Sequence, residues 1–172
     1  NQCAYVCSHA AIRPFALTKE EVAAAPAGLK TTEKMIGKGC EDLVFVMAIS
    51  PLDCMGCTLC VKACPVTTKA LKEATAAANA QYPDDPKKAA KEAAKASVAK
   101  SALIMVPQAE EAAQQPVFDW AVANVSEKQE LINATVKGSQ FKQPLLEFSG
   151  SCAGCAETSY ARLVTQLFGD KM

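Results

Sequence analysis

The cysteine spacing constrains this chain more than any other feature of its sequence. Nine cysteines occur in 172 residues, and four of them form the run Cys54-Met-Gly-Cys57-Thr-Leu-Cys60-Val-Lys-Ala-Cys64-Pro65. Three thiolates spaced by three residues lie on a loop that can curl around one inorganic cube, with the backbone amides of the loop turned toward it. The fourth cysteine, four residues further along, points out of that loop.

This C-x2-C-x2-C-x3-C-P spacing is typical of bacterial ferredoxins, which bind 4Fe–4S clusters. A tetrahedral zinc site usually takes two separated pairs of ligands, so three closely spaced cysteines favour iron–sulfur over zinc. Disulfide frameworks are typical of small secreted chains with an even number of cysteines. Because this chain has nine cysteines and shows no export signal, the disulfide interpretation is disfavoured.

A second, incomplete run opens the chain. Cys3-Ala-Tyr-Val-Cys7 has the same gap as the third and fourth cysteines of a ferredoxin run, and the fourth cysteine of each run binds the other cluster. The spacing therefore predicts one complete cluster bound by Cys7, Cys54, Cys57 and Cys60. It also predicts half of a second cluster at Cys3 and Cys64, with the two remaining cysteines just before residue 1.

A third pair, Cys152-Ala-Gly-Cys155, precedes a predicted helix. Alone, this C-x-x-C is compatible with a redox dithiol, half of a metal site or two buried thiols. Amides at the start of the helix would favour negative charge at Cys155. Two thiolates do not hold a cube, so we expect the partner ligands beyond Met172. Since the chain also starts with Asn1 and stops directly after the helix, we expect it to be an internal piece of a longer polypeptide.

The overall charge excludes two classes of partner. Eighteen basic residues balance eighteen acidic ones, whereas nucleic-acid and polybasic membrane-surface proteins carry a basic excess. The longest apolar run, Leu43 to Ile49, has seven residues, far fewer than the roughly 20 that a membrane-spanning helix needs. No transmembrane span is therefore predicted.

Several elements can be predicted from local patterns. Thr18 and Glu21 form a capping box at the start of a helix. Residues 43–49 and 103–106 are predicted strands, because β-branched and apolar residues dominate them. Residues 70–102 are rich in alanine, lysine and glutamate and are broken by Tyr82-Pro83-Asp84-Asp85-Pro86, which predicts two exposed helices around a turn.

The second half of the chain gives weaker patterns until its end. Residues 107–142 show no clear period and are predicted to form an extended connector. Near the C-terminus, apolar residues recur at helical spacing and Gly169 follows as a helix stop. The members of this apolar stripe are Tyr160, Leu163, Val164, Leu167 and Phe168.

Two further residues need an interpretation. Cys40 fits no ligand spacing, and we interpret it as a buried or half-buried thiol. His9, the single histidine, could tune a cluster through a hydrogen bond, but we predict a structural histidine whose hydrogen bonds are satisfied. Ser8 stands where ferredoxins usually have proline.

Taken together, the chain resembles pyruvate:ferredoxin (flavodoxin) oxidoreductase, a family of thiamine-diphosphate enzymes that oxidatively decarboxylate pyruvate onto coenzyme A. The resemblance covers nearly all of the chain except the alanine-rich stretch. The segments that carry it are Cys3 to Pro14, the cysteine run at 54–65 and Gln143 to Tyr160. Within the third segment, Ala156 and Ser159 replace the usual glycine and proline of the family.

The resemblance implies an α+β architecture. Residues 1–106 would form a ferredoxin-like two-cluster 4Fe–4S domain with helices inserted at 67–102. Residues 107–142 would be the extended connector, and 143–172 the start of an α/β thiamine-diphosphate domain with its first helix. Cys152 and Cys155 match the two ligands that this last segment gives to the cluster nearest the thiamine cofactor.

The function implied is electron relay. In the family, single electrons pass from a thiamine-bound intermediate through 4Fe–4S clusters to ferredoxin or flavodoxin. Thiamine diphosphate, Mg and coenzyme A are expected only in the intact enzyme, because this sequence contains no recognisable diphosphate-binding motif or catalytic residue. The expected partners are the electron acceptor, the remainder of the same polypeptide and a second copy in a homodimer. The expected location is the cytoplasm or an anaerobic organelle.

Two alternatives come from other classes of protein. A stand-alone dicluster ferredoxin would be a small carrier, and a zinc-stabilised module would serve interaction. The incomplete first run, the balanced charge and more than a hundred residues after Pro65 disfavour the first. The three closely spaced cysteines disfavour the second.

Overall fold

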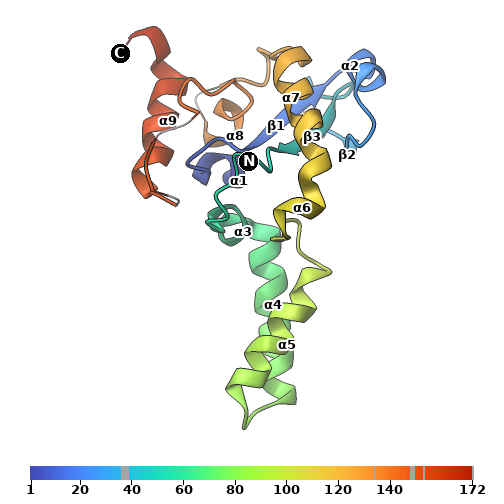
Figure 1. Ribbon diagram of the computed structural model, residues 1–172, viewed down its shortest axis with the longest axis vertical. Helices are drawn as coiled ribbons and strands as arrows, with labels where there is room; N and C mark the ends of the chain where they lie inside the picture. The colour runs from blue at the N-terminus through green and yellow to red at the C-terminus, as the bar shows by residue number, and fades with distance from the viewer. Residues whose placement is uncertain (36–38, 134, 148–149, 153, 172) are drawn as a thin grey trace. The chain divides into compact units, whose positions relative to one another are not determined.

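The computed structural model describes residues 1–35, 39–133, 135–147, 150–152 and 154–171 (Figure 1). It divides the chain into two compact units. The first unit comprises residues 1–57 and 106–172, and the second comprises residues 58–105. Helices and one small antiparallel sheet make up the described chain, in agreement with the α+β class.

The first unit contains the three-stranded sheet, in the order β1-β3-β2. Strand β3 (Val44–Ile49) confirms the strand predicted at 43–49 and pairs with β1 (Ile12–Leu17) along the whole length of both strands. Strand β2 (Thr31–Lys34) pairs with its other edge, with a shift in register along the pair. Both pairings are antiparallel.

One face of this sheet carries the hydrophobic core. Leu17, Val46 and Ala48 on the strands pack with Phe118 of α7 (Gln115–Asn124). Aromatic and aliphatic side chains from neighbouring elements extend the cluster: Phe15, Val22, Leu29, Trp120, Val122 and Val125. This position of α7 matters for the site, because α7 also contacts the turn that follows β3.

The capping box predicted at Thr18 is present. Thr18 Oγ1 accepts a hydrogen bond from the Glu21 amide, and the Glu21 carboxylate accepts one from the Thr18 amide at 2.8 Å. It begins α2 (Lys19–Ala24), which ends before Pro26 as expected. The local prediction is therefore confirmed at both ends of the helix.

The extended conformation predicted for residues 107–142 is wrong. This segment contains α6 (Gln108–Glu111), a 3-10 turn η1 (Ala112–Gln114), α7 and α8 (Val136–Ser139). The longest of these helices is α7, with ten residues, and it buries Val117, Phe118 and Ala121. Packing against the sheet stabilises α7, which would be marginal as an isolated helix of this length.

The C-terminal helix is present as α9 (Ala156–Phe168), followed by the turn η2 (Gly169–Lys171). The apolar stripe of a helix usually faces the protein core, but α9 shows the opposite pattern of burial. Polar residues on α9 are buried, namely Thr158, Arg162 and Gln166. Most of the apolar stripe is exposed, at Tyr160, Val164, Leu167 and Phe168. The first unit also contains α1 (Gln2–Val6), which packs against α9.

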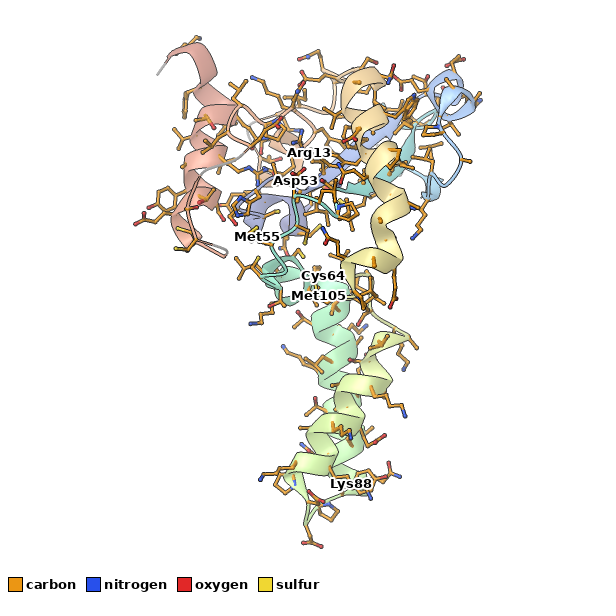
Figure 2. All side chains as sticks on the ribbon, viewed as in Figure 1. Arg13, Asp53, Met55, Cys64, Lys88 and Met105 are labelled. Carbon is orange, nitrogen blue, oxygen red and sulfur yellow. The ribbon has the colours of Figure 1, made fainter. Side chains whose placement is uncertain are left out.

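The second unit is a helical hairpin preceded by one short helix. It contains α3 (Leu59–Ala63), α4 (Pro65–Gln81) and α5 (Pro86–Val98), so the two predicted helices are confirmed. Alanines form the contact between them, at Ala78, Ala89 and Ala93. At the hairpin tip, Lys88 lies over the Tyr82 ring with its Nζ 4.4 Å from the ring centroid (Figure 2).

The strand predicted at 103–106 is wrong, because these residues have no regular structure. Ile104, Met105 and Val106 are exposed and pair with no strand. This short apolar run has no neighbouring strand to pair with, and β-propensity alone is not enough to form a strand. Among the described residues, no helix is both long and apolar enough to cross a membrane.

Candidate metal centre

The first cysteine pair lies at α1. Cys3 is within the helix and Cys7 ends it, so the two thiols are about one helical turn apart. Both side chains are half-buried. Cys3 therefore lies near the start of this short helix and Cys7 directly after its end.

The backbone after Cys7 is tightly held. Ala10 is fully buried with a φ of +51°, in the left-handed region that costs an alanine about 1 kcal/mol or more. Its carbonyl accepts a hydrogen bond from Arg13 Nε at 2.8 Å. Residues around this turn hold it in one conformation in spite of that cost.

Several buried polar atoms beside this turn have no hydrogen-bond partner. They are Ser8 Oγ, His9 Nε2 and, on α9, Arg162 Nε. The prediction of a fully satisfied structural histidine is therefore wrong for Nε2. Buried polar atoms without a partner are rare and call for an explanation, such as a bound group. All three can act as donors, which fits a ligand rich in anionic sulfur.

The second cysteine run begins on the loop after β3. Cys54 is exposed and Cys57 is half-buried. Gly56 and Thr58 have φ values of +66°, so this short loop twice enters the left-handed region. Such a conformation turns successive amide groups toward one concave side, as in many anion and iron–sulfur sites. This agrees with the predicted curled loop.

Two glutamines hold the turn that leads to Cys54. Gln115 Oε1 accepts hydrogen bonds from the Ser50 hydroxyl at 2.8 Å and from the Leu52 amide at 3.1 Å. Gln108 Nε2 donates to the Pro51 carbonyl at 2.9 Å. Figure 2 shows Asp53 and Met55 on this part of the chain. The helices of 107–142 therefore position the start of the cysteine loop, which the sequence did not indicate.

The rest of the run lies in the second unit. Cys60 is on α3, and Cys64 both ends α3 and begins α4 as its N-cap residue. Burial raises the pKa of Cys64, but hydrogen bonds from the amide and hydroxyl of Thr67 and from the Val66 amide lower it more. The pKa of Cys64 therefore lies below its ordinary value. Pro65 occupies the first turn of α4, where its missing N–H costs nothing.

The third cysteine pair precedes α9. The Cys155 amide donates to the Cys152 carbonyl at 3.0 Å, and Cys155 is the N-cap residue of the helix. The amides of Glu157 and Thr158 lower the pKa of Cys155. This confirms the predicted effect of the helix N-terminus on that thiol. Ala153, Phe148 and Ser149, which belong to the same sequence segment, lie outside the described residues.

The structure distributes the cysteines of the three runs over α1, the loop after β3, α3 and the turn before α9. Across the residues it describes, it gathers no set of three or more His, Cys, Asp or Glu side chains that could hold a single metal ion. Four thiolates bind four different irons of a 4Fe–4S cluster. Cys7, Cys54, Cys57, Cys64, Cys152 and Cys155 carry no disulfide bond. Cys40, the cysteine outside the runs, is buried as predicted.

One residue beside the first cysteine pair was not predicted from the sequence. Arg162 is buried on α9, and its NH1 donates to the Ala4 carbonyl at 3.0 Å and to the Cys7 carbonyl. Its burial could not be predicted from the sequence. Arg162 belongs to the polar side of an amphipathic helix, and an arginine at such a position is normally solvated. Thiols, concave amides and unpartnered donors together fit an anionic iron–sulfur group.

Comparisons with known proteins agree with that chemistry. Residues 1–68 match the family described as a 4Fe-4S dicluster domain. The whole chain is 44% identical over 172 residues to a pyruvate-flavodoxin oxidoreductase of Klebsiella pneumoniae, and covers 12% of that protein. It is 42% identical over 173 residues to a pyruvate:ferredoxin oxidoreductase of Moorella thermoacetica, again covering 12%.

A third relative has a different acceptor in its name. It is a pyruvate dehydrogenase [NADP(+)] of Cryptosporidium parvum, 37% identical over 173 residues, of which the chain covers 7%. All three matches extend over 100% of this chain. They confirm the predicted resemblance to pyruvate:ferredoxin and pyruvate-flavodoxin oxidoreductases. The match of residues 1–68 to a 4Fe-4S dicluster domain supports the iron–sulfur interpretation of the first part of the chain. The chain spans about an eighth or less of the length of these relatives.

Proposed function

We propose that this chain is the electron-transfer segment of a 2-oxoacid oxidoreductase that acts on pyruvate. The observation that carries the proposal is the position of the run Cys54 to Cys64 inside the 4Fe-4S dicluster match, within a chain similar throughout to pyruvate oxidoreductases. When bound, 4Fe–4S clusters accept and release single electrons. The segment would pass these electrons to ferredoxin or flavodoxin.

The proposed ligands follow the cysteine spacing. One cluster takes Cys7, Cys54, Cys57 and Cys60. A second takes Cys3 and Cys64 together with two cysteines before residue 1, and a third takes Cys152 and Cys155 with ligands beyond Met172. The lowered pKa values of Cys64 and Cys155 support these roles, because a ligand thiol must lose its proton.

The chain's own residues would prepare these sites in three ways. The left-handed turns at Gly56 and Thr58 present amides to an anionic group. Helix N-termini stabilise the thiolates of Cys64 and Cys155. Gln115 restrains the turn before the cysteine loop, so less conformational entropy is lost when a group binds.

We propose the domain division given by the resemblance. Residues 1–106 would be the ferredoxin-type domain, with α4 and α5 as its inserted helices, and 107–142 would link it to the start of a thiamine-diphosphate domain at 143–172. Thiamine diphosphate, Mg and coenzyme A would bind elsewhere in the intact homodimeric enzyme. Its location would be the cytoplasm or an anaerobic organelle.

Metal analysis tests the cluster assignment. Anaerobically reconstituted protein should contain iron and acid-labile sulfide in equal amounts and little zinc, and its reduced form should give the EPR signal of a 4Fe–4S cluster. Cys57→Ser and Cys7→Ser should each abolish the signal of the complete cluster. Cys40→Ala is the matched control, because this buried cysteine lies outside the proposed ligands, and it should keep the signal. A colourless protein that binds zinc would contradict the assignment and favour an interaction module.

A second measurement separates an enzyme segment from a free carrier. In the longer polypeptide implied by the similarity, addition of pyruvate and coenzyme A should reduce the clusters. Cys57→Ser should stop the reduction of flavodoxin while pyruvate-dependent CO2 exchange continues. If the polypeptide accepts electrons only from a separate reductase, it is a stand-alone dicluster ferredoxin.

A further inference from the structure

Arg162 is an unusual side chain because it is buried and yet held almost entirely by uncharged groups. Its residue is only 2% exposed, and its NH1 donates to the main-chain carbonyls of Ala4 and Cys7. Its Nε has no acceptor. A guanidinium has five N–H donors and stays protonated in proteins, so at least part of its hydrogen-bonding capacity and all of its charge remain to be matched.

The nearest charged groups do not balance it. Arg13 and Glu147 form an ion pair at 3.2 Å, so these two charges neutralise each other. Within the part of the chain that the structure describes, no carboxylate lies within 4.0 Å of Arg162. Burying a charge without a partner costs several kcal/mol on the order-of-magnitude scale for buried ions. Arg162 therefore needs an anion that the protein's carboxylates do not supply.

The contacts of Arg162 show where that anion would lie. Its NH1 donates to the carbonyls of Ala4 and Cys7, so the guanidinium lies beside the backbone of a proposed cluster ligand. Burial lowers the pKa of Arg162. A cluster bound at Cys7 would bring negative charge close to this buried cation. Ser8 Oγ and His9 Nε2, the other unpartnered atoms, adjoin Cys7 in the sequence.

We propose that Arg162 is the buried countercharge of the iron–sulfur cluster that takes Cys7, and that it raises the reduction potential of that cluster. The inference rests on the proposed ligand role of Cys7. Reduction adds one negative charge to the cluster, and a buried cation nearby stabilises that charge more than it stabilises the oxidised form. Arg162 thus acts on the electron relay through charge, and it is a positioning and tuning residue with no bond to iron.

A purely structural role for Arg162 predicts something different. In that case, the side chain would only fasten α9 to the end of α1 through the Ala4 and Cys7 carbonyls. Replacing it would then lower stability and leave the potential of an intact cluster where it was. The reduction potential therefore separates the two roles.

The experiment is an EPR-monitored redox titration of the anaerobically purified, cluster-loaded protein. Arg162→Gln removes the charge and keeps donor capacity, whereas Arg162→Lys keeps the charge. We expect Arg162→Gln to lower the equilibrium constant for reduction of the cluster with Cys7 about tenfold, which corresponds to about 59 mV for one electron. Arg162→Lys should stay close to the wild type. Lys30→Gln, which removes an exposed charge, is the control and should cause no shift.

Each outcome of the titration supports or overturns the proposed role of Arg162. An unshifted potential in a loaded Arg162→Gln protein overturns the proposal, as does an Arg162→Lys protein that shifts as far as Arg162→Gln. If Arg162→Gln does not hold the cluster, Arg162→Lys decides: loading with a potential near the wild type supports a requirement for charge, and failure to load shows that the hydrogen bonds alone matter. Wild-type protein without any cluster contradicts the proposed function instead.

Discussion

Glu21 links two distant parts of the first unit through both of its carboxylate oxygens. Lys128 Nζ lies 2.9 Å from each oxygen, and the amide and hydroxyl of Ser126 donate to Oε1. Burial raises the pKa of Glu21, but these hydrogen bonds and those of Thr18 lower it to about 2. Charge-assisted hydrogen bonds of this kind are stronger than neutral ones.

The depressed pKa predicts a pH-dependent contribution to stability. An unfolded glutamate has a pKa of about 4.3, so the ionised Glu21 stabilises the fold above that pH, and the contribution disappears as the pH falls toward 2. Glu21→Gln keeps the capping geometry and should lower the free energy of unfolding at pH 7 by about 2 kcal/mol. Urea unfolding monitored by circular dichroism between pH 7 and pH 2 measures this difference.

The same titration gives the control. The stability difference between the wild type and Glu21→Gln should shrink steadily below about pH 4. Glu110→Gln removes an exposed carboxylate on α6 and should change stability by about 0.5 kcal/mol or less. A difference at Glu21 that is constant down to pH 2 would contradict the assigned cause.

For single residues, the sequence predicted the interactions between residues that lie close together in the chain. The bond between Thr18 and Glu21 follows from a three-residue spacing. The bond from Glu21 to Lys128 spans 107 positions, and no local pattern points to it. The cysteine pairs could be recognised because their members lie close together in the sequence. The role of Arg162 could not be predicted because its contacts join residues far apart in the sequence.

Among the elements, α7 joins the hydrophobic core to the cysteine loop. One side of the helix packs Phe118 against the sheet, and Gln115 at its start bonds to the turn after β3. The Ser50 hydroxyl is buried, and its single proton is shared between two acceptors, Gln115 Oε1 and Asp53 Oδ2. The order of the loop before Cys54 therefore depends on a helix more than fifty residues away.

Replacement of Gln115 should weaken this connection. Gln115→Leu removes the acceptor of two hydrogen bonds and should lower the free energy of unfolding by about 1 to 2 kcal/mol. We also expect slower cluster loading and lower final iron content, because the loop would be less ordered before binding. Calorimetry and iron analysis after a fixed reconstitution time measure the two effects.

A matched variant separates the hydrogen bonds from general packing. Gln114→Leu changes the adjacent glutamine, whose side chain donates to the Gly28 carbonyl instead. It should leave the loading rate unchanged. Equal loss of iron in both variants would show that α7 as a whole, and not Gln115, controls the loop.

Elements with their own strong patterns were predicted correctly, and those that depend on packing were not. Strand β3 and the α4–α5 hairpin follow from composition and period. Strand β1 was missed because Arg13 and Pro14 interrupt its apolar residues, and pairing with β3 nevertheless completes it. Residues 103–106 have strand-like composition and lack such a partner.

On the scale of the whole molecule, the two units have different kinds of interior. The first has a core of aliphatic and aromatic side chains on a sheet, whereas the hairpin of the second is held mainly by Ala78, Ala89 and Ala93. Alanine buries little apolar area, and hydrophobic stabilisation scales with that area. The hairpin should therefore open at a lower free energy than the sheet.

Hydrogen exchange followed by mass spectrometry tests this difference. Amides of residues 74–81 and 89–95 should exchange faster than those of β3. Ala93→Gly should accelerate exchange in the hairpin further, because it removes a buried methyl group and adds backbone freedom. Ala96→Gly, at an exposed position of the same helix, is the control for backbone freedom alone. Protection in the hairpin equal to that of β3 would contradict the expectation.

The candidate site as a whole was only partly predictable. The spacing predicts the ligand type and the pairing, because iron–sulfur chemistry demands several thiolates close in the sequence, and both stay predictions. The polar surroundings were not predictable, since they come from α7 and α9, which fold back from the second half of the chain. The exposed apolar stripe and buried polar side of α9 reverse the usual relation between helix pattern and burial.

Helix α9 begins at a proposed cluster ligand, Cys155. The same helix contacts a second cysteine turn through Arg162, which bonds to the Cys7 carbonyl. From the N-cap Cys155 to Arg162 is seven residues, a rise of about 10 Å along a rigid axis. Inserting a single residue between them would rotate the guanidinium by about 100° away from the Cys7 turn. The helix thus acts as a fixed spacer, and length changes between these positions would alter the separation and the charge balance of the two sites at once.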